Sequence, residues 1–82
     1  MNNLPRTPAL KIYVKSACPL CQSLADELRR RGIAFSARDI ACSEVWYRRF
    51  KGRVPVILDP VGREFDPPFG SALLDALGRL LG

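Results

Sequence analysis

The sequence predicts an α/β fold in which strands and helices follow the order βαβαββα. Three observations support this order. Apolar residues alternate with other residues over 9–14, apolar residues recur at helical spacing over 19–31, and residues 59–62 (Asp-Pro-Val-Gly) have the composition of a tight turn between strands. The chain has 82 residues, enough for one domain with a small core. We expect a flexible tail over residues 1–8 and a single domain over 9–82.

A short turn separates the first predicted strand from the first predicted helix. In this helix, Cys21, Leu24 and Leu28 share one face, and Gly32 is expected to terminate the helix. The opposite face predicts i, i+4 ion pairs between Asp26 and Arg30 and between Glu27 and Arg31. A second strand over 33–40 would lie parallel to the first, because the two are joined by a right-handed helical crossover.

The second half of the chain predicts a short helix, a hairpin and a final helix. Ser43 is positioned to cap the short helix, which ends near Gly52. A third strand covers 54–58 with its proline near the start, and the tight turn leads to a fourth strand at 63–65. Ser71 is positioned to cap the last helix, whose apolar stripe consists of Leu73, Leu74, Leu77, Leu80 and Leu81.

Composition limits the classes of function. The net charge is +5, which favours anionic partners. No apolar stretch has the length of a membrane span and the first residues lack the apolar region of a signal peptide, so we expect a cytoplasmic protein without membrane contact. Three cysteines are too few for a disulfide-stapled secreted domain, and the lack of histidine removes the Cys-His nucleophile pair and the commonest metal ligand.

Cys18 and Cys21 are the candidate catalytic residues, because they stand at the predicted start of the first helix. With Cys18 as N-cap and Pro19 at the first helical position, the Cys18 sulfur would lie near free backbone N–H groups. An ordinary thiol is only about 3% ionised at neutral pH, and a helix N-terminus lowers the pKa of such a group. Cys21, on the buried face, would resolve a mixed disulfide at Cys18.

Two alternatives to this redox pair stay open: two cysteines buried in the core, and half of a zinc site. Zinc would require two further ligands, and Cys42 is the one remaining thiol. We therefore favour the redox pair and expect no metal site. Cys42 is interpreted as a small, half-buried residue outside the site.

Residues 13–21 (Tyr-Val-Lys-Ser-Ala-Cys-Pro-Leu-Cys) and 53–57 (Arg-Val-Pro-Val-Ile) carry a family resemblance. The chain resembles the glutaredoxins, in particular the small bacterial glutaredoxin-like proteins, over nearly all of residues 9–81. The resemblance implies a minimal thioredoxin fold: a four-stranded mixed sheet with the first and third helices on one face and the second on the other. It also implies an enzyme, a dithiol thiol-disulfide oxidoreductase that uses Cys18 and Cys21.

The same resemblance implies a site for glutathione as a co-substrate, with no tightly bound cofactor. The bond between Val54 and Pro55 would be cis and would expose the backbone of Val54 to a peptide or to glutathione. Lys15 would face the glycine carboxylate of glutathione. Gly70 and Ser71 stand where most glutathione-using members have a Gly-Gly pair followed by aspartate, and Leu20 replaces their usual aromatic residue.

The leading hypothesis is reduction of protein disulfides or glutathione mixed disulfides by a monomer, with a thiol reductant or a reductase as electron donor. One alternative is a carrier of an iron-sulfur cluster held by Cys18 of two subunits and two glutathiones, against which Pro19 argues. Another is a basic module that binds RNA or acidic proteins without redox turnover. It would use Arg48, Arg49, Lys51 and Arg53. Nucleic acid is the less favoured partner.

Overall fold

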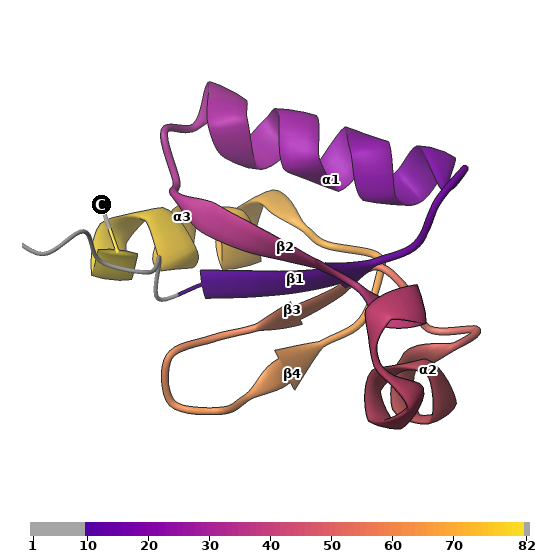
Figure 1. Ribbon diagram of the computed structural model, residues 1–82. Helices are drawn as coiled ribbons and strands as arrows, with labels where there is room; N and C mark the ends of the chain where they lie inside the picture. The colour runs from indigo at the N-terminus through magenta and orange to yellow at the C-terminus, as the bar shows by residue number, and fades with distance from the viewer. Residues whose placement is uncertain (1–9, 82) are drawn as a thin grey trace, which may run out of the picture.

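The computed structural model describes residues 10–81 (Figure 1). The tail predicted for residues 1–8 lies outside the described residues and stays a prediction. No helix within the described part is long and apolar enough to cross a membrane. The elements are β1 (Leu10–Val14), α1 (Pro19–Arg30), β2 (Phe35–Asp39), the 3₁₀ turn η1 (Ile40–Cys42), α2 (Glu44–Phe50), β3 (Val56–Leu58), β4 (Glu64–Phe65) and α3 (Ser71–Leu81).

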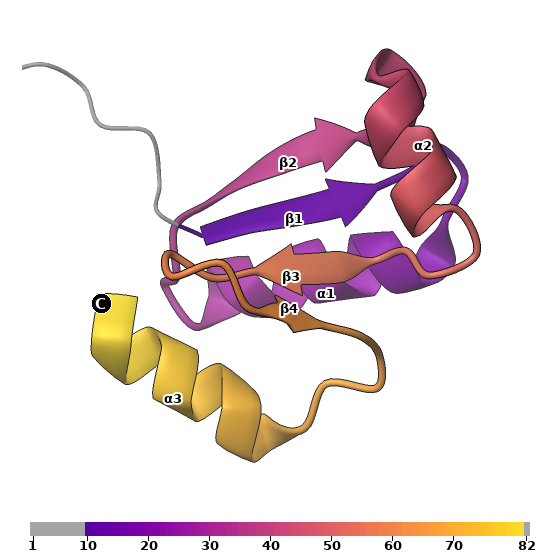
Figure 2. The same cartoon turned by 90° about the horizontal axis from the view of Figure 1, so that it is seen from below.

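The four strands form one mixed sheet in the order β2-β1-β3-β4, which Figure 2 shows side by side. β1 and β2 are parallel, with Ile12 opposite Ala37, as the helical crossover between them requires. β3 is antiparallel to both β1 and β4, and Ile57 lies opposite Ile12 on one side and Phe65 on the other. The predicted element order and the predicted mixed sheet are confirmed.

The helices cover the two faces of the sheet unequally. Alternate residues of a strand point to opposite faces, so Leu10 and Ile12 contribute to one core and Tyr13 to the other. The larger core joins α1 and α3 to the sheet and consists of Leu10, Ile12, Leu24, Leu28, Ile33, Ile57, Leu74 and Leu77. The smaller core joins α2 to the sheet and consists of Tyr13, Ile40, Phe50 and Val56. The predicted placement of the helices is confirmed.

Ion pairs on α1 differ in part from the predicted pattern. Glu27 accepts from the Arg31 Nε atom at 2.7 Å, as predicted, but also pairs with Arg30. Hydrogen bonds from Arg30 and then Arg31 lower the pKa of Glu27 below its ordinary value. The pair predicted between Asp26 and Arg30 is wrong, since Asp26 pairs with Arg29 at 3.3 Å. Residues three and four apart are both neighbours on a helix, so the spacing alone does not select the partner.

The turn between β3 and β4 is built around the buried carboxylate of Asp59, which is 5% exposed. One oxygen accepts from the backbone N–H groups of Val61 (3.0 Å) and Arg63 (2.8 Å), and the other accepts from Arg63 Nε (2.9 Å). Burial acts to raise the pKa of Asp59, but these hydrogen bonds outweigh it and the pKa is lowered. The carboxylate therefore fixes the hairpin that completes the sheet.

The helix α2 begins and packs as the sequence predicts, but Cys42 in the segment before it is not buried as expected. Ser43 caps α2 by accepting from the Trp46 N–H at 3.2 Å. Phe50 stacks on Tyr13 with ring centroids 4.4 Å apart. Cys42 was expected to be half-buried, and this expectation is wrong: Cys42 is exposed, because η1 carries it away from the core that Ile40 enters.

Candidate active site

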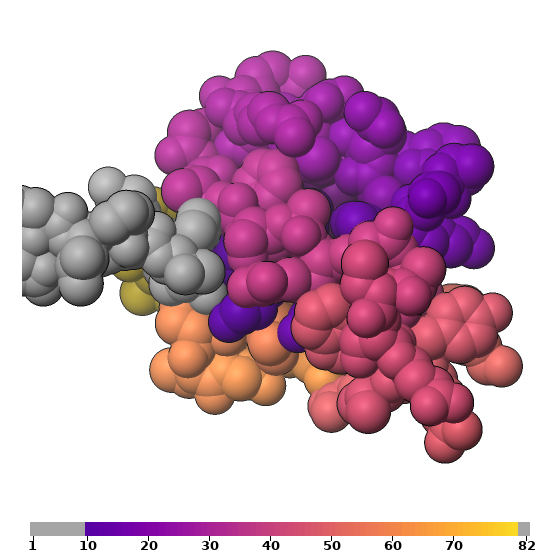
Figure 3. Space-filling model, in the orientation of Figure 1, coloured from indigo at the N-terminus to yellow at the C-terminus, as the bar shows by residue number. Residues whose placement is uncertain are grey.

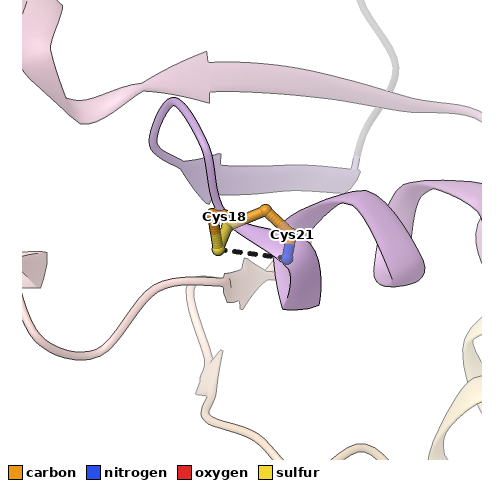
Figure 4. Close-up of a disulfide and its surroundings, with 2 residues drawn as sticks. All are labelled: Cys18 and Cys21. Carbon is orange, nitrogen blue, oxygen red and sulfur yellow. Dashed lines mark hydrogen bonds between the residues drawn. A yellow bond between two sulfur atoms is a disulfide. The ribbon is translucent and has the colours of Figure 1, made fainter.

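Cys18 and Cys21 form a disulfide at the first turn of α1, directly after the loop that follows β1 (Figure 4). Their Cα atoms are 5.2 Å apart, within the range of ordinary disulfides. The structure therefore brings together the two residues predicted as catalytic. Sequence spacing alone left open whether the two side chains would meet.

The sulfur of Cys18 occupies the position of a helix N-cap. The backbone of Cys18 is extended, with φ −115° and ψ 101°, and its Sγ accepts a hydrogen bond from the Cys21 N–H at 3.1 Å (Figure 4). Pro19 follows at the first helical position, where its missing N–H leaves no bond unmade. Unpaired N–H groups give a helix start a partial positive charge. The same geometry would stabilise a thiolate on Cys18 after reduction.

The two sulfurs differ in their surroundings. Cys21 is 5% exposed and lies on the face of α1 that also buries Leu24 and Leu28. Cys18 is half-buried at the start of α1. Apolar burial favours the neutral thiol over the thiolate, whereas the helix start favours the thiolate. Cys18 is thus suited to attack an external disulfide and Cys21 to attack the sulfur of Cys18.

The turn before Cys18 contains a backbone conformation that has no signature in the sequence. Ala17 has a φ of 55°, in the left-handed region that residues other than glycine rarely adopt. The preceding strand and the following helix impose this conformation, because the chain must reverse within a few residues between Val14 and Pro19. Alanine carries no turn signature, so composition did not indicate it.

A groove begins beside the disulfide loop and runs along α1 toward its end. Its volume is about 480 Å³. Leu20, which is 61% exposed, lines the groove at the disulfide loop, and Pro55, Phe69 and the two prolines before Phe69 line it as well. The peptide bond between Val54 and Pro55 is cis, as the resemblance implied. A second cis bond, between Pro67 and Pro68, was not predicted.

A second hollow lies on the other side of the loop. It has a volume of about 270 Å³ and is lined by Lys15, Ser16 and Lys51 together with Asp39 and Tyr47. Lys15 also lines a cleft of about 250 Å³ that contains Cys18 and Cys21. The ammonium group predicted to face a carboxylate is therefore placed next to the disulfide.

The residues predicted to bind glutathione are divided between these hollows. Pro55 and Ser71 line the groove, and Lys15 lines the hollow on the other side. Val54 precedes β3, outside the paired residues of the sheet, and Gly70 lies exposed before α3; neither lines these spaces. Ser71 is the first residue of α3, and Gly70 accepts the first helical hydrogen bond from Leu74 at 3.2 Å. Their roles in binding stay predictions.

Most cations of the predicted basic module are neutralised within the protein. Arg48 pairs with Glu44 and Arg49 pairs with Glu64. Arg53 pairs with Glu64 and Asp66, and hydrogen bonds from Asp66 and then Glu64 raise its pKa. These four cations therefore do not form one open basic surface. Lys51 is the member of this set without an ion pair among the described residues.

Comparisons with known proteins identify solved structures that are similar to this one. A search of curated proteins found no match. The solved structure of protein XcR50 from X. campestris is similar, with 35% identity, a TM-score of 0.74 and coverage of 83% of this chain and 92% of that chain. Protein Ne2328 from Nitrosomonas europaea matches with 25% identity, a TM-score of 0.69 and full coverage of both chains. A wheat glutaredoxin shares the fold at 19% identity and a TM-score of 0.65, with coverage of 90% and 82%.

A family match covers most of the chain. The family described as Glutaredoxin-like domain (DUF836) matches residues 9–76. The four-stranded mixed sheet and its three helices agree with a minimal thioredoxin-like fold. The chain therefore belongs to the family of the Glutaredoxin-like domain (DUF836), and its Cys18-Cys21 pair supports a thiol redox role.

Proposed function

We propose that the protein is a dithiol thiol-disulfide oxidoreductase that reduces disulfides of proteins or mixed disulfides of glutathione. One observation carries this proposal: the Cys18 sulfur caps α1 and accepts the Cys21 N–H, while Cys21 itself is buried behind it. A sulfur so placed is stabilised as a thiolate, and the second sulfur is already within bonding distance.

The reaction would proceed in two exchanges. The Cys18 thiolate attacks one sulfur of the substrate disulfide, a bond forms between them, and the other substrate sulfur leaves as a thiolate that takes up a proton. Cys21 then loses its proton and attacks Cys18, and the second substrate sulfur leaves in the same way. The substrate gains two electrons and two protons, and the protein becomes the Cys18-Cys21 disulfide. A thiol reductant or a reductase returns it to the dithiol.

Glutathione is proposed as a co-substrate on more limited grounds. Lys15 lines the cleft that contains Cys18 and Cys21, where an ammonium group would attract a carboxylate. Ser71 and the cis Pro55 line the groove on the other side. This groove is largely apolar and extends well beyond the disulfide loop, which also favours a polypeptide substrate.

Single cysteine variants test the proposal. Cys18→Ser should abolish reduction of a peptide disulfide. Cys21→Ser should instead accumulate a mixed disulfide between Cys18 and the substrate, detectable by mass spectrometry, because the first exchange proceeds and the second cannot. Cys42→Ser is the matched control and should retain the activity of the unaltered protein. Equal activity of the Cys18→Ser variant and the unaltered protein would refute the assignment.

The electron donor is tested with the unaltered protein. Reduction is followed with glutathione and glutathione reductase in one assay and with thioredoxin reductase in the other. Activity with the first system alone would support the glutathione site around Lys15. Inactivity of the folded protein with both donors, and with a dithiol supplied chemically, would contradict the proposed function.

A further inference from the structure

The charges of the protein separate into a paired set and an unpaired set. Within residues 10–81, every carboxylate except that of Asp39 takes part in an ion pair. Asp39 instead caps η1 through the Ala41 N–H. Within the same residues, the cations without a carboxylate partner are Lys11, Lys15, Arg38, Lys51 and Arg79.

Four of these cations lie on the α2 side of the sheet. Tyr13 faces α2, because its ring packs against Trp46 and Phe50. Residues two positions away along a strand share a face, so Lys11 also lies on this side, and Arg38 lies beside Tyr13 in the parallel register. Figure 2 views this face of the sheet, with α2 in front of the strands, and Figure 3 views the molecule from the β2 edge, with α2 at the lower right.

The unpaired cations continue up to the disulfide. Lys15 and Lys51 line the same hollow, and Lys15 lines the cleft that contains Cys18. We call Lys11, Arg38, Lys51 and Lys15 the basic strip. Arg79 lies in the last turn of α3, a helix that packs through Leu74 and Leu77 on the other face of the sheet.

We propose that the basic strip docks an acidic polypeptide segment next to the disulfide that Cys18 attacks. This inference rests on the proposed function and specifies its substrate class. Cations without internal partners carry a field into solvent, and such fields raise the association rate of oppositely charged partners by about 10- to 1,000-fold at low salt. Because the strip ends at the reactive cysteine, acidic residues of a substrate would bind where they orient its disulfide toward Cys18.

The surroundings of the strip favour a polypeptide over RNA. Binding of single-stranded RNA uses exposed aromatic rings on which bases stack. Here Tyr13 and Phe50 are buried against each other, and Trp46 packs edge-on against Tyr13 with centroids 5.5 Å apart. Tyr47 is exposed, but Lys51 lies over its ring at 5.6 Å. RNA also contains no disulfide for the neighbouring site to reduce.

Three synthetic peptides provide the test. They share one disulfide ring and differ only in flanking residues, which are glutamate, serine or lysine. The reduced protein should reduce the glutamate peptide about tenfold faster than the lysine peptide at low salt, with the serine peptide between them. The difference should shrink as salt rises, since the Debye length falls to about 10 Å at 0.1 M. A competing mixed-sequence RNA should not slow reduction of the serine peptide.

Charge reversal assigns the effect to the strip. A double variant, Lys11→Glu with Arg38→Glu, should lower the ratio of glutamate-peptide to serine-peptide rate constants by about tenfold. Arg79→Glu, a single reversal on the helix α3 that packs on the other face of the sheet, should leave that ratio unchanged. Equal rates for the three peptides, or strong inhibition by RNA, would overturn this inference alone. Failure to reduce any of the peptides would overturn the proposed function as well.

Discussion

Stabilisation of the Cys18 thiolate by the start of α1 is the effect on which the chemistry depends, and it can be isolated in one variant. Cys21→Ser together with Cys42→Ser leaves Cys18 as the single thiol while keeping the backbone N–H at position 21 that its sulfur accepts. Unfolding this variant in urea removes the helix and leaves the thiol unchanged. The difference between the folded and unfolded titrations therefore measures the contribution of the helix start.

The size of that contribution follows from the two interactions at the sulfur. A hydrogen bond to a charged group contributes about 1.5–3 kcal/mol, and the helix dipole adds about 0.3–1 kcal/mol near its end. Partial desolvation of the half-buried sulfur opposes both. A net value of about 2 kcal/mol corresponds to roughly a 30-fold larger ionisation constant. The ionised fraction at neutral pH would then rise from about 3% to about one half.

Thiolate absorbance in the ultraviolet, followed against pH, measures this fraction directly. The folded variant should ionise at clearly lower pH than the unfolded variant. The rate of alkylation at neutral pH should rise as well, but by a smaller factor, because a more stable thiolate is a weaker nucleophile. Coincident titrations of the folded and unfolded forms would refute the reasoning, since they would show that the capping hydrogen bond gives the thiolate no advantage.

Three further predictions concern the electrostatics of the site and the stability of the fold. Leu20→Asp places a carboxylate beside the Cys18 thiolate, and the repulsion of about 1 kcal/mol should make the reduction potential more negative by about 20 mV. Leu20→Asn adds no charge and should leave the potential unchanged. Redox titration against glutathione distinguishes the two variants. Asp59→Asn should lower the free energy of unfolding by about 1–3 kcal/mol in urea titration. Because folding lowers the pKa of Asp59, the carboxylate stabilises the fold at pH values above its pKa in the unfolded chain, and this stabilisation disappears as the pH falls through its pKa in the folded protein. Acidification should therefore lower the free energy of unfolding less in Asp59→Asn than in the unaltered protein. Phe50→Ala should cost about 3–5 kcal/mol by the same titration, since Phe50 fills the core beneath α2; a loss below about 1 kcal/mol would contradict that packing.

The parts of the fold that depend on periodic patterns were predictable from the sequence. Strand alternation and the helical spacing after Cys18 located β1 and α1, because burial of one face imposes those periods. Strand ends were less predictable. β2 covers Phe35–Asp39, shorter than the predicted 33–40, since β1 offers only five residues to pair with it and Ile33 enters the core between α1 and α3 instead.

The parts that depend on single side chains meeting in three dimensions were not predictable. Asp59 reads as an ordinary turn residue, and its central role appears only when both oxygens are seen to accept hydrogen bonds within the hairpin. Similarly, Arg49 and Arg53 are far from Glu64 in the chain, and α2 and the turn after it bring them to β4. Such pairs determine which cations stay unpaired, so the basic strip could not be derived from the count of charges.

Within the candidate site, the cysteine pair and the substrate surfaces differ in how they are specified. Cys21 donates its N–H to Cys18, is buried like Leu24 on the inner side of α1, and supplies the second sulfur of the disulfide. One short motif at a helix start thus fixes the geometry of the exchange, because the core holds the helix in place. Apart from Leu20, the residues of the groove and of the basic strip lie outside this motif. Changes at those other residues would alter the choice of substrate while the exchange at Cys18 stays the same.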